Sequence, residues 1–188
     1  LFGSKIRVKV LKFLFRNYPS DFSVTELSKR IQESPKAIKK EIGILGQIKL
    51  IKKINGGQQY VLNSNFEFFN ELKGFILKSP PAEKDRLVKR ISKLGKIKLA
   101  VLSGIFLSNV SEGAAYENSV ADLFIVGDEI SKEKLRSFLK TLEAEVGREI
   151  RLSIMDKEEF DYRYGMFDRF VRVLLESPHE KIINKLGL

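Results

Sequence analysis

The 188-residue chain contains no cysteine and a single histidine, His179. Without cysteine it can form neither a disulfide framework nor a thiolate metal site, and one histidine cannot build a histidine-rich metal site. No apolar run approaches membrane-spanning length, and the opening residues Leu1 to Ser4 lack the apolar core of a signal peptide. We therefore expect a cytoplasmic protein with no membrane partner.

Acidic residues are scarce in the first part of the chain. Residues 1–78 hold 15 Lys and Arg against 6 Asp and Glu, a balance of +9, whereas residues 79–188 hold 19 against 18, a balance of +1. Hydrophobic residues make up 43% of the sequence, enough for one sizeable core or two small ones. This asymmetry is expected of a nucleic-acid-binding module joined to a neutral domain.

Two helix starts lie close together in the basic part, after a first helix predicted over residues 4–18. Ser23 and Glu26 can form a capping box, in which each side chain accepts from the backbone N–H of the other residue. Ser34 suits the N-cap of a second helix, and Pro35 suits its first position, where no N–H is needed. Two short helices at this spacing predict a helix-turn-helix pair.

The second helix of the pair has two different faces. Ile38, Ile42 and Leu45 recur at i, i+4 and i+7, which predicts an apolar stripe facing the core. Its other face is predicted to carry Lys36, Lys39, Lys40, Gly43 and Gln47. Lysines here can contact phosphates or guanines, a glycine permits close approach to a duplex, and a glutamine amide can bind an adenine edge. The alternative is an ordinary solvated lysine face.

A polar hairpin is predicted directly after this helix. Asn55-Gly56-Gly57 supplies residues that tolerate positive φ, and it lies between two runs typical of strands. Basic and amide side chains lie along this hairpin: Lys52, Lys53, Asn55, Gln58 and Gln59. A helix pair followed by such a hairpin predicts a winged helix-turn-helix domain over residues 1–65 that binds double-stranded DNA, with the second helix in the major groove. The predicted DNA contacts are Ser34, Lys36, Lys39, Lys40, Gly43 and Gln47 on the helix, and Lys52, Lys53, Asn55 and Gln58 on the hairpin.

An aromatic-rich helix is predicted over residues 66–77. Ser79-Pro80-Pro81 ends it, so we place a linker at residues 66–83. Its phenylalanines are expected either to fill an inter-domain core or to form the seam of a homodimer, because two-fold symmetry suits palindromic DNA.

Residues 84–188 are predicted to form a second domain with a short central sheet, which makes the whole chain α+β. The predicted elements are a helix over 83–94, strands over 97–102, 120–126 and 149–155, a polar loop over 108–119, and helices over 131–146, 157–164, 167–175 and 179–186.

Four runs in this domain carry a family resemblance: Leu99 to Gly104, Asp122 to Asp128, Val146 to Ile150 and Lys157 to Phe160. They resemble the small nucleotidyltransferase domain, and the whole chain resembles bacterial and archaeal regulators that fuse such a domain behind a winged helix. The resemblance implies a Gly-Ser turn for the nucleotide phosphates and an Asp-x-Asp pair for divalent metals.

The chain departs from both elements of that pattern. It has Ser103-Gly104 in place of Gly-Ser, and Val120-Ala121-Asp122 in place of Asp-x-Asp, so one carboxylate remains. One carboxylate holds a pair of Mg²⁺ ions poorly. We therefore expect a retained fold without catalysis, metal or cofactor, in which Ser103, Gly104 and Asp122 are vestigial positions. Asp122 is expected to be a relic at a strand end or a solvated terminal residue, and the alternative is a weak ligand.

The predicted function is a sequence-specific DNA-binding transcriptional regulator. Its second domain would serve dimerisation, bind a protein or nucleotide partner, or sense a ligand. Two alternatives stay open: an active nucleotidyltransferase with a DNA- or RNA-binding winged helix, and a winged-helix adaptor that binds protein. A nucleotide-plus-Mg²⁺ assay would support the first, and strongly salt-dependent DNA affinity would exclude the second.

Overall fold

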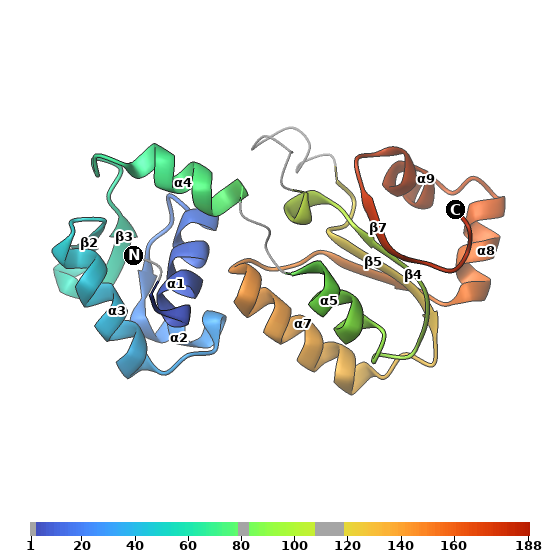
Figure 1. The fold of residues 1–188 in the computed structure, drawn as a ribbon, viewed down its shortest axis with the longest axis horizontal. Coiled ribbons are helices and arrows are strands. Elements are labelled where there is room, and N and C mark those ends of the chain that lie inside the picture. The colour runs from blue at the N-terminus through green and yellow to red at the C-terminus, as the bar shows by residue number, and fades with distance from the viewer. Residues whose placement is uncertain (1–2, 79–82, 108–118) are drawn as a thin grey trace. The chain divides into compact units, whose positions relative to one another are not determined.

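The computed structural model describes residues 3–78, 83–107 and 119–188, and in these ranges it forms eight α-helices and two small sheets (Figure 1). The protein is therefore of the mixed α+β class, as predicted. The predicted Pro80-Pro81 stop and most of the predicted polar loop over 108–119 lie outside the described residues.

Two compact units make up the chain. Leu1–Ser79 with Thr141–Glu149 form the first, and Pro80–Lys140 with Ile150–Leu188 form the second. Helix α7 (Lys132–Val146) contributes residues to both.

The first unit begins with three helices, and each has a serine at its N-cap. The helices are α1 (Lys5–Arg16), α2 (Val24–Ile31) and α3 (Pro35–Gln47). The hydroxyl oxygens of Ser4, Ser23 and Ser34 accept the N–H of the residue three positions on, at 3.2 to 3.3 Å. Each hydroxyl satisfies a backbone donor that has no partner inside its helix, which is why the predicted starts are confirmed.

A three-stranded antiparallel sheet completes the first unit. Strands β1 (Phe22–Ser23), β2 (Ile51–Ile54) and β3 (Gln59–Leu62) lie in the order β1-β3-β2, and the turn η1 (Asn55–Gly57) joins the last two. The predicted hairpin is therefore present, with Lys52 opposite Val61 and Lys53 opposite Tyr60.

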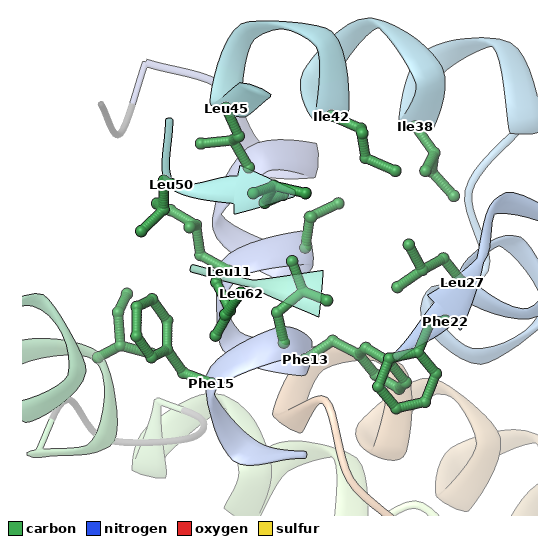
Figure 2. Packing of buried hydrophobic residues seen from close by; sticks show 14 of the residues in the cluster. Leu11, Phe13, Phe15, Phe22, Leu27, Ile38, Ile42, Leu45, Leu50 and Leu62 are labelled. Atoms are coloured by element: carbon green, nitrogen blue, oxygen red, sulfur yellow. The ribbon is translucent and has the colours of Figure 1, made fainter. Parts of the chain in front are cut away.

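The core of the first unit lies between α1, α3 and this sheet. Figure 2 shows Ile38, Ile42 and Leu45 pointing from α3 toward Leu11 and Leu62, and all five side chains are buried. This confirms the apolar stripe predicted for α3.

Helix α4 (Phe69–Lys78) packs on α1 and begins three residues later than predicted. The ring centroid of Phe69 lies 5.5 Å from that of Phe15 and 5.1 Å from that of Tyr18. Part of the aromatic run therefore belongs to the core of the first unit, while Phe68 and Phe75 are exposed.

The second unit is built on a four-stranded sheet in the order β6-β5-β4-β7. Its strands are β4 (Lys96–Leu102), β5 (Leu123–Asp128), β6 (Leu152–Met155) and β7 (Glu180–Asn184). Strand β4 is antiparallel to β5 and β7, whereas β5 and β6 are parallel. Strands β5 and β6 each begin three residues later than predicted.

Helices cover both faces of this sheet. Helices α8 (Lys157–Gly165) and α9 (Arg169–Glu176) lie on one face, and α5 (Lys84–Ile91) and α7 lie on the other (Figure 1). Phe160 and Leu174 pack against Phe124 and Val126 to form the core under α8 and α9. A short turn, η2 (Gly104–Phe106), follows β4.

The helix predicted over residues 179–186 is wrong, because this segment forms strand β7. Ile183 pairs with Ala100 across the ladder with β4. Apolar residues at 182, 183 and 186 fit a helix as well as a strand when neighbours are ignored. Pairing with the free side of β4 decides the conformation, since a buried strand needs partners for its backbone groups.

No helix within the three described ranges combines the length and the apolar character needed to cross a bilayer.

Candidate nucleic-acid interface

Helix α3 separates a buried face from an exposed one. Its buried residues are Ile38, Ile42, Leu45 and Glu41. The exposed residues include all of those predicted to contact DNA on this helix: Ser34 at the N-cap, then Lys36, Lys39, Lys40, Gly43 and Gln47. These side chains share one face because their spacing of three, four and seven residues matches the helical repeat.

An ion pair fixes α3 to α1 from the inner side. Glu41 is 6% exposed, and the Nε of Arg7 donates to its Oε2 at 2.7 Å. Burial alone would raise the pKa of the Glu41 carboxyl. Hydrogen bonds from Ser4 and Arg7 and the positive charges of Arg7 and Lys40 outweigh burial and lower that pKa below its ordinary value. The carboxylate therefore stays ionised and anchors the helix whose opposite face is exposed.

The hairpin presents the second group of predicted residues. Lys52, Lys53 and Gln58 are exposed on the β2–β3 hairpin. Asn55, Gly56 and Gly57 all have positive φ, at 50°, 66° and 87°. Such a run suits asparagine and glycine, so the turn residues determine the path of the hairpin.

A side-chain hydrogen bond closes this turn. The Nδ2 of Asn55 donates to the Oε1 of Gln59. Two polar residues of the predicted wing, of which Asn55 is a predicted DNA contact, thus bind each other across the tip of the hairpin.

The segment that contains α3 and the hairpin is almost free of acidic residues. Between residues 34 and 62 there are six lysines and one acidic residue, Glu41. Because Glu41 is buried against Arg7, it does not offset the lysines at the surface. Every exposed charged residue of this segment is therefore positive, as binding to a polyanion requires.

One of these lysines, Lys49, was not among the DNA contacts predicted from the sequence. It is exposed in the turn between α3 and β2, and its φ is 61°. A lysine directly between the predicted helix and the predicted hairpin was the available signal.

The vestigial positions of the second unit also lie together. Asp122 directly precedes β5 and is 0% exposed, so the expectation that it could be a solvated residue is wrong. Its Oδ1 accepts the N–H of Ile105 at 3.2 Å and Nη2 of Arg151 at 2.9 Å. Its Oδ2 accepts the backbone N–H of Arg151 at 2.9 Å and its Nε at 3.0 Å. Four donors therefore engage the lone pairs of this carboxylate.

Ser103 and Gly104 complete this cluster. The Ser103 hydroxyl donates to the carbonyl oxygen of Ala121, which also accepts the Ser119 hydroxyl at 2.6 Å. Gly104 has φ 52°, and a Cβ at this position would lie 2.1 Å from Oδ1 of Asp122. The backbone can approach the carboxylate this closely only with glycine.

The sequence analysis found no role for Arg151. Strands β5 and β6 are parallel, with Leu123 opposite Leu152, so the residues that precede the two strands are also neighbours. An acidic and a basic residue before two adjacent parallel strands were the signal for this pair. The described parts of the chain contain no group of three Asp, Glu or His side chains arranged to hold a metal ion.

The interpretation of the α3 and hairpin surface, and that of the group around Asp122, rest on geometry alone. Comparisons of the chain with protein-family models, with curated proteins and with solved structures find no match.

Proposed function

We propose that the chain is a DNA-binding transcriptional regulator and that its first unit is a winged helix-turn-helix domain. The observation that carries the proposal is the exposed face of α3, on which three lysines, a glycine and a glutamine lie together, while the one acidic residue of the helix, Glu41, is buried. A helix of this kind can enter the major groove of a duplex, where the wide groove admits a helix and base edges are accessible.

Each part of the surface has its own role in this proposal. Lys36, Lys39 and Lys40 contact phosphates or guanines, and the N-cap Ser34 lies at the end of α3 that meets the backbone. Gly43 lets the duplex approach the helix, and Gln47 binds a base edge through its amide. The hairpin contacts the neighbouring phosphates or the minor groove through Lys52, Lys53, Asn55 and Gln58.

The second unit, in this proposal, is a nucleotidyltransferase-like domain that has lost catalysis. Support comes from Asp122, whose carboxylate is occupied by Arg151 and by backbone N–H groups. A guanidinium in this place neutralises the one remaining carboxylate and donates hydrogen bonds to both of its oxygens. The unit would then act in dimerisation, in binding a protein or nucleotide partner, or in ligand sensing.

The test is the affinity of the intact chain for a random-sequence duplex, measured by fluorescence anisotropy at several salt concentrations. We expect affinity to fall steeply with salt, because bound lysines release counterions from the DNA. Lys36→Ala/Lys39→Ala/Lys40→Ala should weaken binding and reduce the slope of log K against log salt by up to about 2.7, at about 0.9 per phosphate contact.

A matched control removes the same charge from the second unit. Lys93, Lys132 and Lys134 are exposed there, and the triple alanine variant should bind DNA nearly as the wild type does. Equal losses in the two variants would mean that only net charge matters. No binding by the wild type at low salt would contradict the proposed function.

A further inference from the structure

The last turn of α8 and the turn that leads to α9 expose a group of large apolar side chains. Tyr162, Tyr164, Met166 and Phe167 are exposed, with Met166 at 66% and Phe167 at 78%. We call residues 162–167 the aromatic segment. Four of the eight large hydrophobic residues that are exposed within the described ranges lie in these six positions. An exposed apolar cluster of this kind marks an interaction site or a ligand-binding groove.

A groove of about 640 Å³ lies beside the aromatic segment. Tyr164 and Phe167 form part of its wall, and Val171, Leu175 and Leu188 supply further apolar lining. Its size and apolar lining are enough to take up a large aromatic side chain.

The backbone holds Phe167 in place at the cost of strain. Its φ is 54°, a left-handed conformation that is unusual for a bulky residue. The Asp168 carboxylate caps α9 by accepting the N–H of Phe170 at 3.0 Å and of Val171 at 3.2 Å, and the N–H of Asp168 donates to the carbonyl of Arg163 at 2.9 Å. Phe167 therefore projects from a fixed turn. The N–H of Phe167 also donates to the carbonyl of Tyr164 at 3.2 Å, so this left-handed residue belongs to the turn that ends α8, where glycine is the usual residue and an aromatic side chain is held exposed instead.

The charges around the groove favour a second copy of this chain as the partner. Two acidic and two basic residues line it: Asp168, Glu176, Arg172 and Lys181. Arg172 pairs with Glu176 at 3.0 Å, and within the described ranges no acidic side chain pairs with Lys181. A rim that carries both signs can meet the same rim of a second copy with opposite charges facing each other, whereas its acids disfavour a nucleic acid. By contrast, the excess of nine positive charges in residues 1–78 makes two copies of that region repel each other.

We propose that this groove is the homodimer interface, in which Phe167 of each copy inserts into the groove of the other. The exposed aromatic side chain and the groove lie next to each other on one surface, so a two-fold axis between the copies makes both insertions at once. Lys181 of one copy then faces Asp168 or Glu176 of the other. This inference narrows the proposed role of the second unit and does not depend on DNA binding by the first.

The experiment measures the mass of the chain of residues 1–188 without DNA by sedimentation equilibrium over a wide concentration range. We expect a monomer–dimer equilibrium for the wild type. Phe167→Gly should raise the dimer dissociation constant at least tenfold, while the melting temperature of the dilute monomer stays unchanged or rises because glycine relieves the strained φ. Phe167→Asn is the second variant, since asparagine also tolerates this conformation.

Phe68→Gly is the matched control. Phe68 is also an exposed phenylalanine, 56% exposed, but it lies in the first unit next to α4, where the sequence placed the alternative dimer seam. It should leave the dissociation constant unchanged. A wild type that stays monomeric, a Phe167→Gly variant that dimerises normally, or a dimer lost only through Phe68→Gly would each overturn the inference. Loss of DNA binding in a protein that still dimerises would instead contradict the proposed function.

Discussion

The guanidinium of Arg151 binds the carboxylate of Asp122 through two parallel hydrogen bonds, Nε to Oδ2 at 3.0 Å and Nη2 to Oδ1 at 2.9 Å. The two partners differ in their surroundings, because the Asp122 side chain is fully buried while that of Arg151 is 38% exposed. Removing the arginine therefore leaves a buried carboxylate without its counter-charge.

We predict that Arg151→Met destabilises the protein by about 3 kcal/mol, the lower end of the range for a buried ion pair broken from one side, because Arg151 is itself partly exposed. Urea unfolding measures the change. Lys157→Met is the control, since Lys157 pairs with Asp161 on the surface of α8 and such pairs contribute about 0.3–0.5 kcal/mol. Similar losses of unfolding free energy in both variants would show that the Arg151–Asp122 pair stabilises the protein no more than a surface ion pair does.

Gly104 should tolerate alanine much less than Gly56 does. Both have positive φ, 52° and 66°, so alanine costs each site about 1–2 kcal/mol in backbone strain. At Gly104 the new Cβ also meets Oδ1 of Asp122 at 2.1 Å, whereas nothing lies within 4 Å of a Cβ at Gly56. The difference in unfolding free energy between Gly104→Ala and Gly56→Ala measures this clash, and equal losses would contradict it.

Gly43→Ala should separate stability from DNA binding. An added Cβ at Gly43 meets nothing within 4 Å, so alanine should stabilise α3 by about 1 kcal/mol through its helix propensity. If the duplex approaches this position closely, DNA affinity should nevertheless fall. Gly74→Ala in α4 has equally open space and should give the same gain without a loss of affinity. Unchanged DNA affinity in Gly43→Ala would mean that the duplex does not come close to Gly43.

Stability should fall in acid partly through Glu41. The pKa of Glu41 is lowered in the folded protein, so its contribution is complete above the ordinary value of 4.5. As the pH falls below that value, the unfolded chain takes up the proton first, and the contribution is lost as the pH passes through the folded pKa.

Glu41→Gln should cost about 1.5–3 kcal/mol at neutral pH, because it removes a hydrogen bond between charged groups. The difference between wild type and variant should shrink as the pH is lowered. Urea unfolding between about pH 3 and pH 7 measures it. A difference that does not change with pH would show that the charge of Glu41 is not what stabilises α3.

The first unit was predictable because its signals are local. Ser4, Ser23 and Ser34 lie three residues before the N–H groups that they accept, and the apolar spacing of α3 needs only neighbouring turns of one helix. The exposure of Lys36 and Lys40 follows from the same periodicity, so that surface could be predicted without the fold.

The second unit was less predictable because distant contacts decide its details. Strand β7 exists through its pairing with β4, and Asp122 is buried by an arginine 29 residues away. Neither the partner strand of β7 nor the arginine beside Asp122 can be identified from the sequence pattern before the order of the strands is known. The strained turn at Phe167 is equally hidden, since nothing in its neighbours requires a left-handed conformation.

The division of α3 into two faces has a consequence for how such a protein can diverge. The buried face and the Arg7–Glu41 pair hold the helix, whereas the exposed lysines take no part in packing. Under the proposed function, exchanging Lys36, Lys39 or Gln47 for other residues would therefore change which DNA is bound at almost no cost in folding. Lineages that share this core would then acquire new operators one surface substitution at a time.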